Sequence, residues 1–146
     1  MSEETRKTTR TALSWDQEFK EPGVKDLRAL LLQISGASTV GNIEIFRLCL
    51  AIGYESGIKR PVPSRASDAV RIGDLKETDS ALFRIIAIDD EKNGEVLLDE
   101  NKIYDVVEQY AAQGLMILCQ EMARQPSFAD WLNSKLFKSL KRQVAG

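Results

Sequence analysis

Histidine is absent from this chain of 146 residues, and its absence removes several classes of function. Ser-His-Asp and Cys-His nucleophile systems need an imidazole base, and many zinc and iron sites need imidazole ligands. The two cysteines, Cys49 and Cys119, cannot build an ordinary structural zinc site by themselves. Both lie in apolar helical patterns, where we expect buried and reduced thiols. The catalytic chemistry that remains depends on carboxylates, as in magnesium-dependent phosphoryl transfer or paired acid–base work.

The chain also lacks long apolar runs, an apolar signal segment and glycine-rich phosphate-binding patterns. A typical apolar run, residues 48–52, is far shorter than the roughly 18 residues that cross a bilayer. The first residues, MSEETRKTTRTALS, contain no apolar signal region. Neither G-x-x-x-x-G-K-[ST] nor G-x-G-x-x-G occurs, so nucleotide binding has no support. We therefore expect a cytoplasmic protein without a cofactor and without membrane association.

The composition, with 43% hydrophobic and 29% charged residues, is typical of a globular protein. Residues 1–22 are polar, with Leu13, Trp15 and Phe19 as isolated apolar anchors, and we interpret them as a flexible N-terminal arm. Residues 23–146 then form a single helical domain. The expected fold class is mainly α, a compact domain of five or six helices with at most one short β-hairpin.

Helical periodicity identifies the main elements of that domain. Apolar residues recur at helical spacing in five segments, residues 24–34, 43–56, 78–88, 103–122 and 127–144. Asn42 is suited to cap the second segment. That segment is apolar on nearly every side, which predicts a place in the middle of the core or at a subunit interface. Residues 70–72 alternate briefly and indicate a short strand.

Two groups of basic residues are the candidate binding site. The first lies in and after a loop that begins at Gly57 and is stiffened by Pro61 and Pro63. The second forms a stripe on the last helix, opposite its apolar side. Together the candidate contacts to DNA phosphates are Lys59, Arg60, Arg65, Arg71, Lys135, Lys138, Lys141 and Arg142. The alternatives are a solvated loop, and cations that complement the dipole at the end of the last helix.

The overall charge limits how this site can act. A formal net charge of −2 is unlike that of an independent DNA-binding domain, which is usually basic. Aromatic residues are not interleaved with the cations, so stacking on single-stranded bases is not expected. Contact with a DNA backbone, or with an acidic protein surface, would then be local and shared with larger partners.

The acidic turn at Asp89, Asp90 and Glu91 is the candidate metal site in this sequence, because carboxylates cluster there. A magnesium site needs carboxylates that converge from separate elements, whereas consecutive acids on one turn diverge. A solvated turn is therefore the favoured interpretation, and no metal site is predicted. The enzymatic alternative is a metal-dependent nuclease that uses Asp89, Asp90 or Glu95.

Several blocks of the sequence, in order, carry a family resemblance: IFRLCLAIGYESGIKRPVP, VRIGDL, ALFRIIAI and VLLDENKIYDVVEQYAAQGLMIL. Over residues 42–122 the chain resembles small prokaryotic proteins associated with Dnd-type phosphorothioate DNA modification and restriction systems. Where that family's pattern leads us to expect Ala-Asn-Gly-Gly-Leu after Tyr110, this chain has Ala-Ala-Gln-Gly-Leu. The resemblance implies an accessory subunit of an anti-phage defence system, and it supplies no catalytic residue.

The expected function is a non-enzymatic accessory subunit of a prokaryotic anti-phage DNA-defence complex. The subunit would contact the DNA backbone, bridge larger protein subunits, or do both. The first alternative is a purely structural adaptor between larger ATPase or nuclease subunits, without DNA contact. The second is the metal-dependent nuclease described above.

Overall fold

The computed structural model of the protein describes residues 10–62 and 65–145, and the side chains of residues 65–68 and 137–145 lie outside this description. Within the described residues the fold is mainly α, with six helices and one two-stranded antiparallel sheet, as the sequence predicted. The elements in chain order are β1 Ala12–Asp16, α1 Gln17–Lys20, α2 Gly23–Ser35, α3 Asn42–Ser56, β2 Arg65–Arg71, η1 Ile72–Asp74, α4 Glu77–Glu91, η2 Gly94–Leu98, α5 Glu100–Arg124 and α6 Phe128–Ala145, where η denotes a short 3-10 helix.

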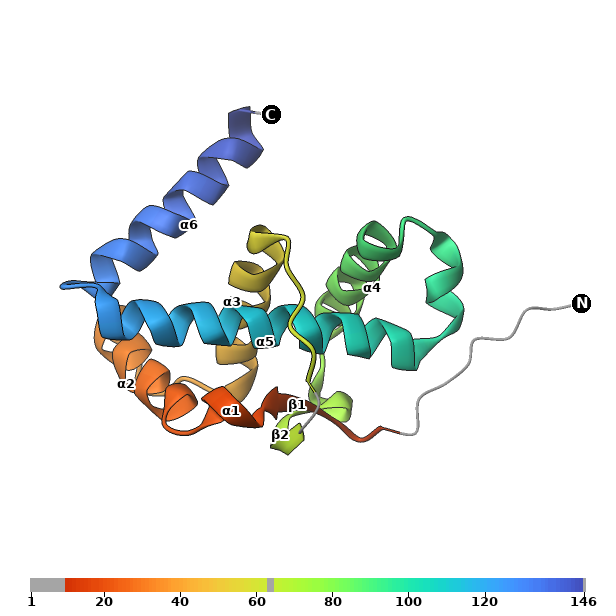
Figure 1. Ribbon diagram of the computed structural model, residues 1–146, viewed down its shortest axis with the longest axis horizontal. Coiled ribbons are helices and arrows are strands. Elements are labelled where there is room, and N and C mark those ends of the chain that lie inside the picture. Colours follow the sequence, from red (N-terminus) through yellow and green to blue (C-terminus); the bar gives the residue numbers. More distant parts are fainter. Residues whose placement is uncertain (1–9, 63–64, 146) are drawn as a thin grey trace, which may run out of the picture.

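Helix α5 is the axis of the molecule. It runs across the whole structure, with α4 near its N-terminal end, α6 at its C-terminal end, and α2, α1 and β1 along one side (Figure 1). The Asp99 side chain accepts a hydrogen bond from the Lys102 amide and caps its first turn. The helix ends before Pro126, which has no amide hydrogen to continue it.

Helices α3 and α5 cross at two glycines. A Cβ atom on Gly53 would lie 1.7 Å from the Tyr110 carbonyl oxygen, and one on Gly114 would lie 1.7 Å from the Cys49 carbonyl oxygen. The two backbones therefore touch directly, and any side chain at either position would separate the helices. Helix α3 lies in the core of the molecule, which is one of the two positions predicted from its apolar surface.

A chain of aromatic rings connects three elements of the core. The Trp15 and Phe46 ring centroids are 5.8 Å apart, and the Phe46 and Phe83 centroids are 6.2 Å apart. Tilted and edge-on contacts at these distances add to the apolar burial of the rings. The chain links β1 to α3 and α3 to α4.

The structure differs from the predicted N-terminal boundary. Residues 1–9 of the predicted arm lie outside the described residues, but β1 and α1 belong to the body of the protein. Leu13 and Trp15 are buried on β1, which pairs with β2 in the register Ala12↔Arg71 and Leu13↔Val70. Leu13 and Trp15 alternate with less buried residues, as in a half-buried strand. In the sequence this short alternation is hard to recognise because most of the surrounding residues are polar.

Helix α6 leaves the body after its first turns. Phe128 and Leu132 are buried, and the Trp131 ring stacks on that of Phe128 with centroids 5.6 Å apart. One turn further on, Leu136 is already 41% exposed. Figure 1 shows the rest of α6 projecting away from the other elements. Among the helices of the described chain, none combines the length and apolar character that crossing a bilayer requires.

Candidate nucleic-acid interface

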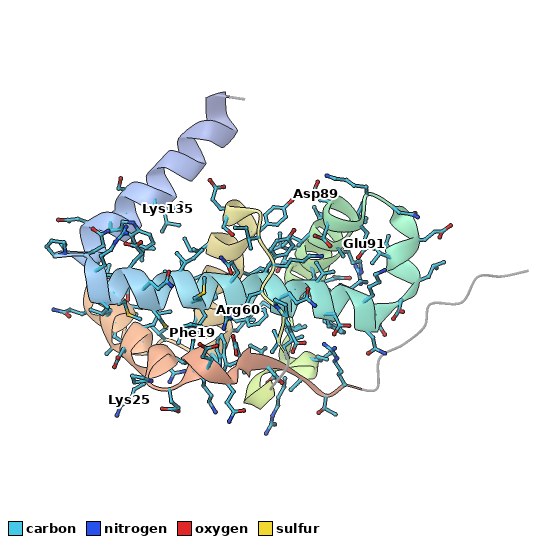
Figure 2. The ribbon with its side chains drawn as sticks, in the orientation of Figure 1. Phe19, Lys25, Arg60, Asp89, Glu91 and Lys135 are labelled. Atoms are coloured by element: carbon cyan, nitrogen blue, oxygen red, sulfur yellow. The ribbon has the colours of Figure 1, made fainter. Side chains whose placement is uncertain are left out.

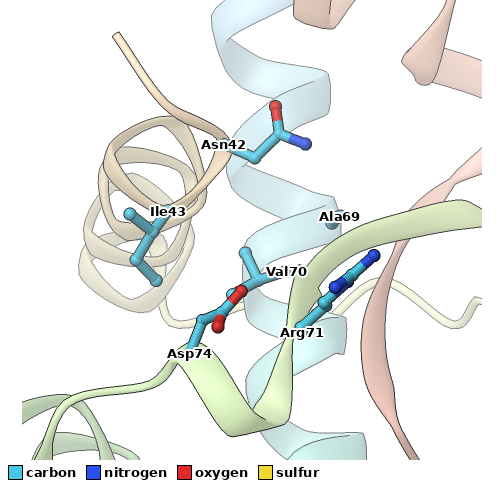
Figure 3. Close-up of a pocket in the computed structure, with 6 residues that line it drawn as sticks. All are labelled: Asn42, Ile43, Ala69, Val70, Arg71 and Asp74. Carbon is cyan, nitrogen blue, oxygen red and sulfur yellow. The ribbon is translucent and has the colours of Figure 1, made fainter.

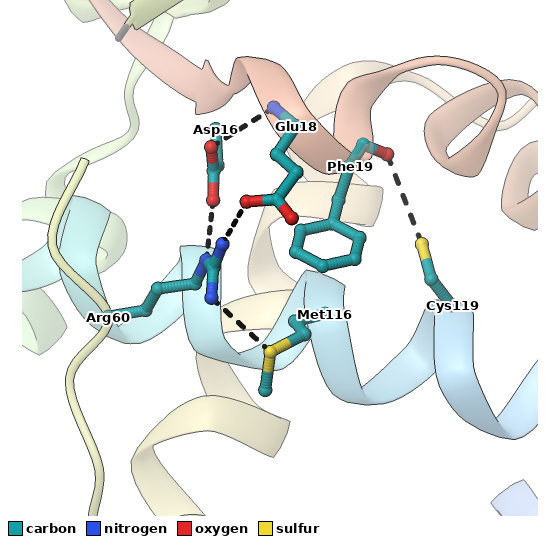
Figure 4. A network of polar contacts seen from close by, with 6 residues as sticks. All are labelled: Asp16, Glu18, Phe19, Arg60, Met116 and Cys119. Carbon is teal, nitrogen blue, oxygen red and sulfur yellow. Dashed lines mark hydrogen bonds and ion pairs between the residues drawn. The ribbon is translucent and has the colours of Figure 1, made fainter. Parts of the chain in front are cut away.

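Arg60 lies against the body of the protein and is held by two carboxylates. Its Nε atom donates to Asp16 Oδ2 at 2.6 Å, and its Nη2 atom pairs with Glu18. The guanidinium carbon lies 4.8 Å from the centroid of the Phe19 ring, which adds a cation–π contact (Figure 4). The hydrogen bond to Asp16 is the main reason that the pKa of Arg60 is raised. Arg60 therefore anchors the loop to α1, and its charge is already balanced.

Lys59 points to a different carboxylate, at the end of α4. Its Nζ atom lies 2.7 Å from Asp90 Oδ2, and the same carboxylate accepts a hydrogen bond from the Tyr110 hydroxyl at 2.7 Å. Asp89, the neighbouring acid, accepts from the Tyr54 hydroxyl at 2.5 Å and pairs with Lys92 at 2.9 Å. This acidic turn is thus a structural junction between α3, α4 and α5 and differs from the solvated turn expected from the sequence.

Arg71 is exposed and borders a hollow at the N-terminal end of α3. The hollow has a volume of about 490 Å³ and is lined by Asn42, Ile43, Ala69, Val70, Arg71 and Asp74. In Figure 3 the Asn42 and Ile43 side chains of α3 lie across this hollow from Arg71 and Asp74. The three described loop cations, Lys59, Arg60 and Arg71, therefore lie in separate places and do not form one patch. The Arg65 side chain lies outside the described residues.

The cations of the last helix lie in a different part of the molecule. Lys135 is partly exposed on α6, well apart from Arg60 in Figure 2. Lys138, Lys141 and Arg142 belong to α6, but their side chains lie outside the described residues. By sequence, α6 carries these four cations and one carboxylate, Asp130 in its first turn. Among the described side chains, Lys135 does not form a continuous surface with the cations of the loop.

Two ion pairs that involve buried carboxylates were missed by reading the sequence. Asp79 accepts from Arg47 through both carboxylate oxygens, at 2.8 and 2.9 Å, and joins α4 to α3. Glu108, in the middle of α5, accepts from Arg10 at 2.7 Å and from the Ser14 amide at 2.6 Å, which fastens β1 to the axis helix. The sequence does contain one signal for these ion pairs: Asp79 and Glu108 are charged residues within apolar helical segments. A charged side chain that is buried in such a segment needs a partner of opposite charge or a hydrogen bond.

The described residues contain no group of three or more His, Cys, Asp or Glu side chains placed to hold a metal ion. Burial raises the pKa of both thiols, that of Cys119 to about 11, and each cysteine is free. Asp16, Asp79, Asp90 and Glu108 instead pair with cations from other segments and connect them.

Comparison with protein-family models, with curated proteins and with solved structures found no match. The resemblance to Dnd-associated proteins therefore stays a prediction.

Proposed function

We propose that this protein is a non-enzymatic accessory subunit of a prokaryotic anti-phage DNA-defence complex, and that α6 supplies its contact with the DNA backbone. One observation carries the choice of α6. This helix leaves the body after Leu132 and concentrates four cations against one carboxylate. A projecting cationic helix can lie along phosphates without displacing any packed element.

The loop cations support this proposal less well. Lys59 and Arg60 are each within 2.7 Å of a carboxylate of the same chain. Phosphate contact through them would first have to break these ion pairs, and the carboxylates left behind would repel the phosphates. The net charge of −2 also restricts any DNA contact to a local surface.

A matched pair of variants tests the role of α6. The double variant Lys138→Gln/Lys141→Gln removes two cations from α6, and Lys25→Gln/Arg84→Gln removes two exposed cations from α2 and α4. Binding to a duplex DNA fragment is measured by fluorescence anisotropy at several salt concentrations. We expect only the α6 variant to weaken binding, and its slope of log K against log salt to fall by about 2, since each phosphate contact contributes about 0.9. Equal effects of the two variants, or no binding by the unmodified protein at low salt, would contradict the proposal.

The assignment to a defence complex has its own test. The protein is co-expressed with its genomic neighbours and purified at low and at high salt. Retention of a large ATPase or nuclease at high salt supports an obligate subunit held by apolar burial. Elution alone at both salt concentrations would contradict this part of the proposal and leave the DNA contact to be judged by the α6 variants.

A structural adaptor without DNA contact is the second candidate. An exposed apolar surface on α4 favours it, because Leu82 is 43% and Ile85 is 62% exposed. Contiguous exposed apolar surface is a common sign of a protein-binding site. This candidate predicts partner retention at high salt together with unchanged DNA binding in both double variants.

A further inference from the structure

A hollow lies between α4, η2 and the first turns of α5, at the opposite end of the molecule from α6 (Figure 1). Its volume is about 270 Å³. Phe83 of α4, Leu97 of η2 and Ile103 of α5 supply its apolar walls, and the Phe83 and Ile103 side chains are buried. These three elements pack on one another, so the hollow is formed by the fold itself, as small-molecule sites usually are.

The Tyr104 hydroxyl has no hydrogen-bond partner among the described residues. Tyr104 is only 8% exposed, and it lines the hollow. In the same part of the chain, every side-chain nitrogen or oxygen that is fully enclosed by protein does have a partner. The hydroxyl is therefore not enclosed, and the hollow is the space onto which it opens. A buried tyrosine usually bonds its hydroxyl to the protein, so this one is available to a ligand.

Two further polar groups border the hollow on the same side of α4. Ser80 and Arg84 are four positions apart, which places them one above the other on the helix. Within the described chain, neither the Ser80 hydroxyl nor the Arg84 guanidinium has a hydrogen-bond or ion-pair partner. Glu100 also lines the hollow, but it already has an interaction partner. The groups left for a ligand are thus one guanidinium and two hydroxyls beside an apolar wall.

We propose that the hollow binds a small monocarboxylic acid, in its ionised form, that has a compact apolar body. Arg84 would pair with the carboxylate, for which a guanidinium is well shaped, and the Tyr104 and Ser80 hydroxyls would donate to its oxygens. The apolar body would lie on the apolar walls. The volume is just below the usual range of about 300–1,000 Å³ for ligand sites, which limits the ligand to a small molecule.

The surroundings of Tyr104 favour a single negative charge on the ligand. Burial is the main cause that raises the pKa of Tyr104; the Glu100 carboxylate raises it too, whereas Arg84 acts in the opposite direction. The phenol therefore stays neutral and can donate its hydrogen. Since the Glu100 carboxylate also acts on this site, it would repel a second negative charge, which disfavours phosphate and dicarboxylates. The site is separate from α6, so the inference does not depend on DNA binding.

Titration of the full chain with benzoate, followed by two-dimensional amide NMR, tests the inference. We expect saturable shifts that centre on α4, η2 and the first turns of α5. Benzamide has the same shape without the charge, and inorganic phosphate has the charge without the apolar body. Each should bind at least tenfold more weakly than benzoate. Butyrate and isovalerate extend the test to aliphatic acids.

Two matched pairs of variants identify the groups that bind. Arg84→Gln and Tyr104→Phe should each weaken benzoate binding at least tenfold. Their controls, Lys25→Gln at an exposed cation of α2 and Tyr54→Phe at a phenol that bonds Asp89, should leave it unchanged. Because the Tyr104 hydroxyl has no partner in the described chain, Tyr104→Phe should also leave the urea midpoint unchanged, which separates a binding role from a structural one.

Three results would overturn the inference. The first is no saturable shift with any of the three monocarboxylates. The second is binding of benzamide or phosphate as tight as that of benzoate. The third is unchanged benzoate binding in Arg84→Gln and Tyr104→Phe, with circular dichroism melting used to confirm that both variants are folded.

Discussion

Tyr54 and Tyr110 place their hydroxyl groups against the two carboxylates at the end of α4. The hydrogen bond to Asp89 raises the pKa of Tyr54 to about 12. Burial, followed by the hydrogen bond to Asp90, raises the pKa of Tyr110 further. Burial also raises the pKa of Tyr104, the third tyrosine of the chain. Each of these phenols is therefore held in its neutral form in the folded protein.

An alkaline titration followed by phenolate absorbance checks this arrangement. In the folded protein we expect Tyr54 and Tyr110 to carry little phenolate at about pH 10.5, whereas in denaturant the tyrosines should titrate near their ordinary pKa of about 10. Since the folded pKa values are raised, the unfolded chain releases these protons first, and the stability falls as the pH rises above about 10. A folded protein in which more than one tyrosine ionised near pH 10, with its circular dichroism unchanged, would contradict the hydrogen bonds of Tyr54 and Tyr110.

The loop cations show what a sequence does not reveal about a candidate site. Lys59, Arg60 and Arg71 are close in the chain, and their spacing predicts one basic patch. Each instead takes its surroundings from a distant element: Lys59 from α4, Arg60 from α1, and Arg71 from the end of α3. The local sequence shows how many cations a loop contains. It does not show which carboxylates from distant segments pair with them in the folded protein.

At the scale of the elements, Asp79 is the connection between α3 and α4. Its carboxylate receives both Arg47 hydrogen bonds, and also one from the Lys76 amide at 3.1 Å at the start of α4. The hydrogen bond from Arg47 is the main reason that the pKa of Asp79 is lowered. One side chain thus closes the first turn of α4 and fixes that helix to its neighbour.

We expect Asp79→Asn to lower the free energy of unfolding by about 1–3 kcal/mol at neutral pH, because hydrogen bonds to a charged partner are lost. The folded pKa is lowered, so this stabilisation is present above the unfolded pKa of about 4 and is lost as the pH falls below it. Urea unfolding at about pH 7 and about pH 3 should therefore show a smaller difference between the two proteins at the lower pH. Asp74→Asn, at an exposed carboxylate nearby, is the control and should change the stability little at either pH. A difference that did not shrink in acid would argue against the ion pair.

Most helices could be predicted because their signals are local. Periodic apolar residues, Gly57 and Pro126 mark α3 and α5. At the start of α6 the Asp130 amide donates to the Ser127 hydroxyl at 3.3 Å. Asn42, predicted as a cap, instead accepts a hydrogen bond from Arg28 through its side chain. The pairing of β1 with β2 joins residues that are 49 to 59 positions apart, and no local pattern indicates such a contact.

At the scale of the whole molecule, the contact between Gly53 and Gly114 determines how closely the core can pack. Gly53→Ala or Gly114→Ala would press a methyl group into a backbone carbonyl that cannot rotate away. We expect each substitution to cost at least about 3 kcal/mol, the upper end of the usual range for overpacking. The cost is measured by chemical denaturation.

Gly73→Ala is the control, because a Cβ atom at that position meets nothing within 4 Å. The double variant Gly53→Ala/Gly114→Ala should cost less than the two single changes added together, since one separation of the helices relieves both clashes. Full additivity would show that the two glycines do not share a contact.

The position of this crossing also bears on how the chain folds during synthesis. Helix α3 packs on a segment that lies about 60 residues later in the chain. The loop between the two segments must close, at a cost in chain entropy, before most of the apolar surface of α3 can be buried. A ribosome adds residues from the N-terminus, so the apolar surface of α3 emerges well before α5 can cover it. Nascent chains that end before Gly114 should therefore be open to proteases and bound by chaperones, and protection should appear only after α5 has left the exit tunnel.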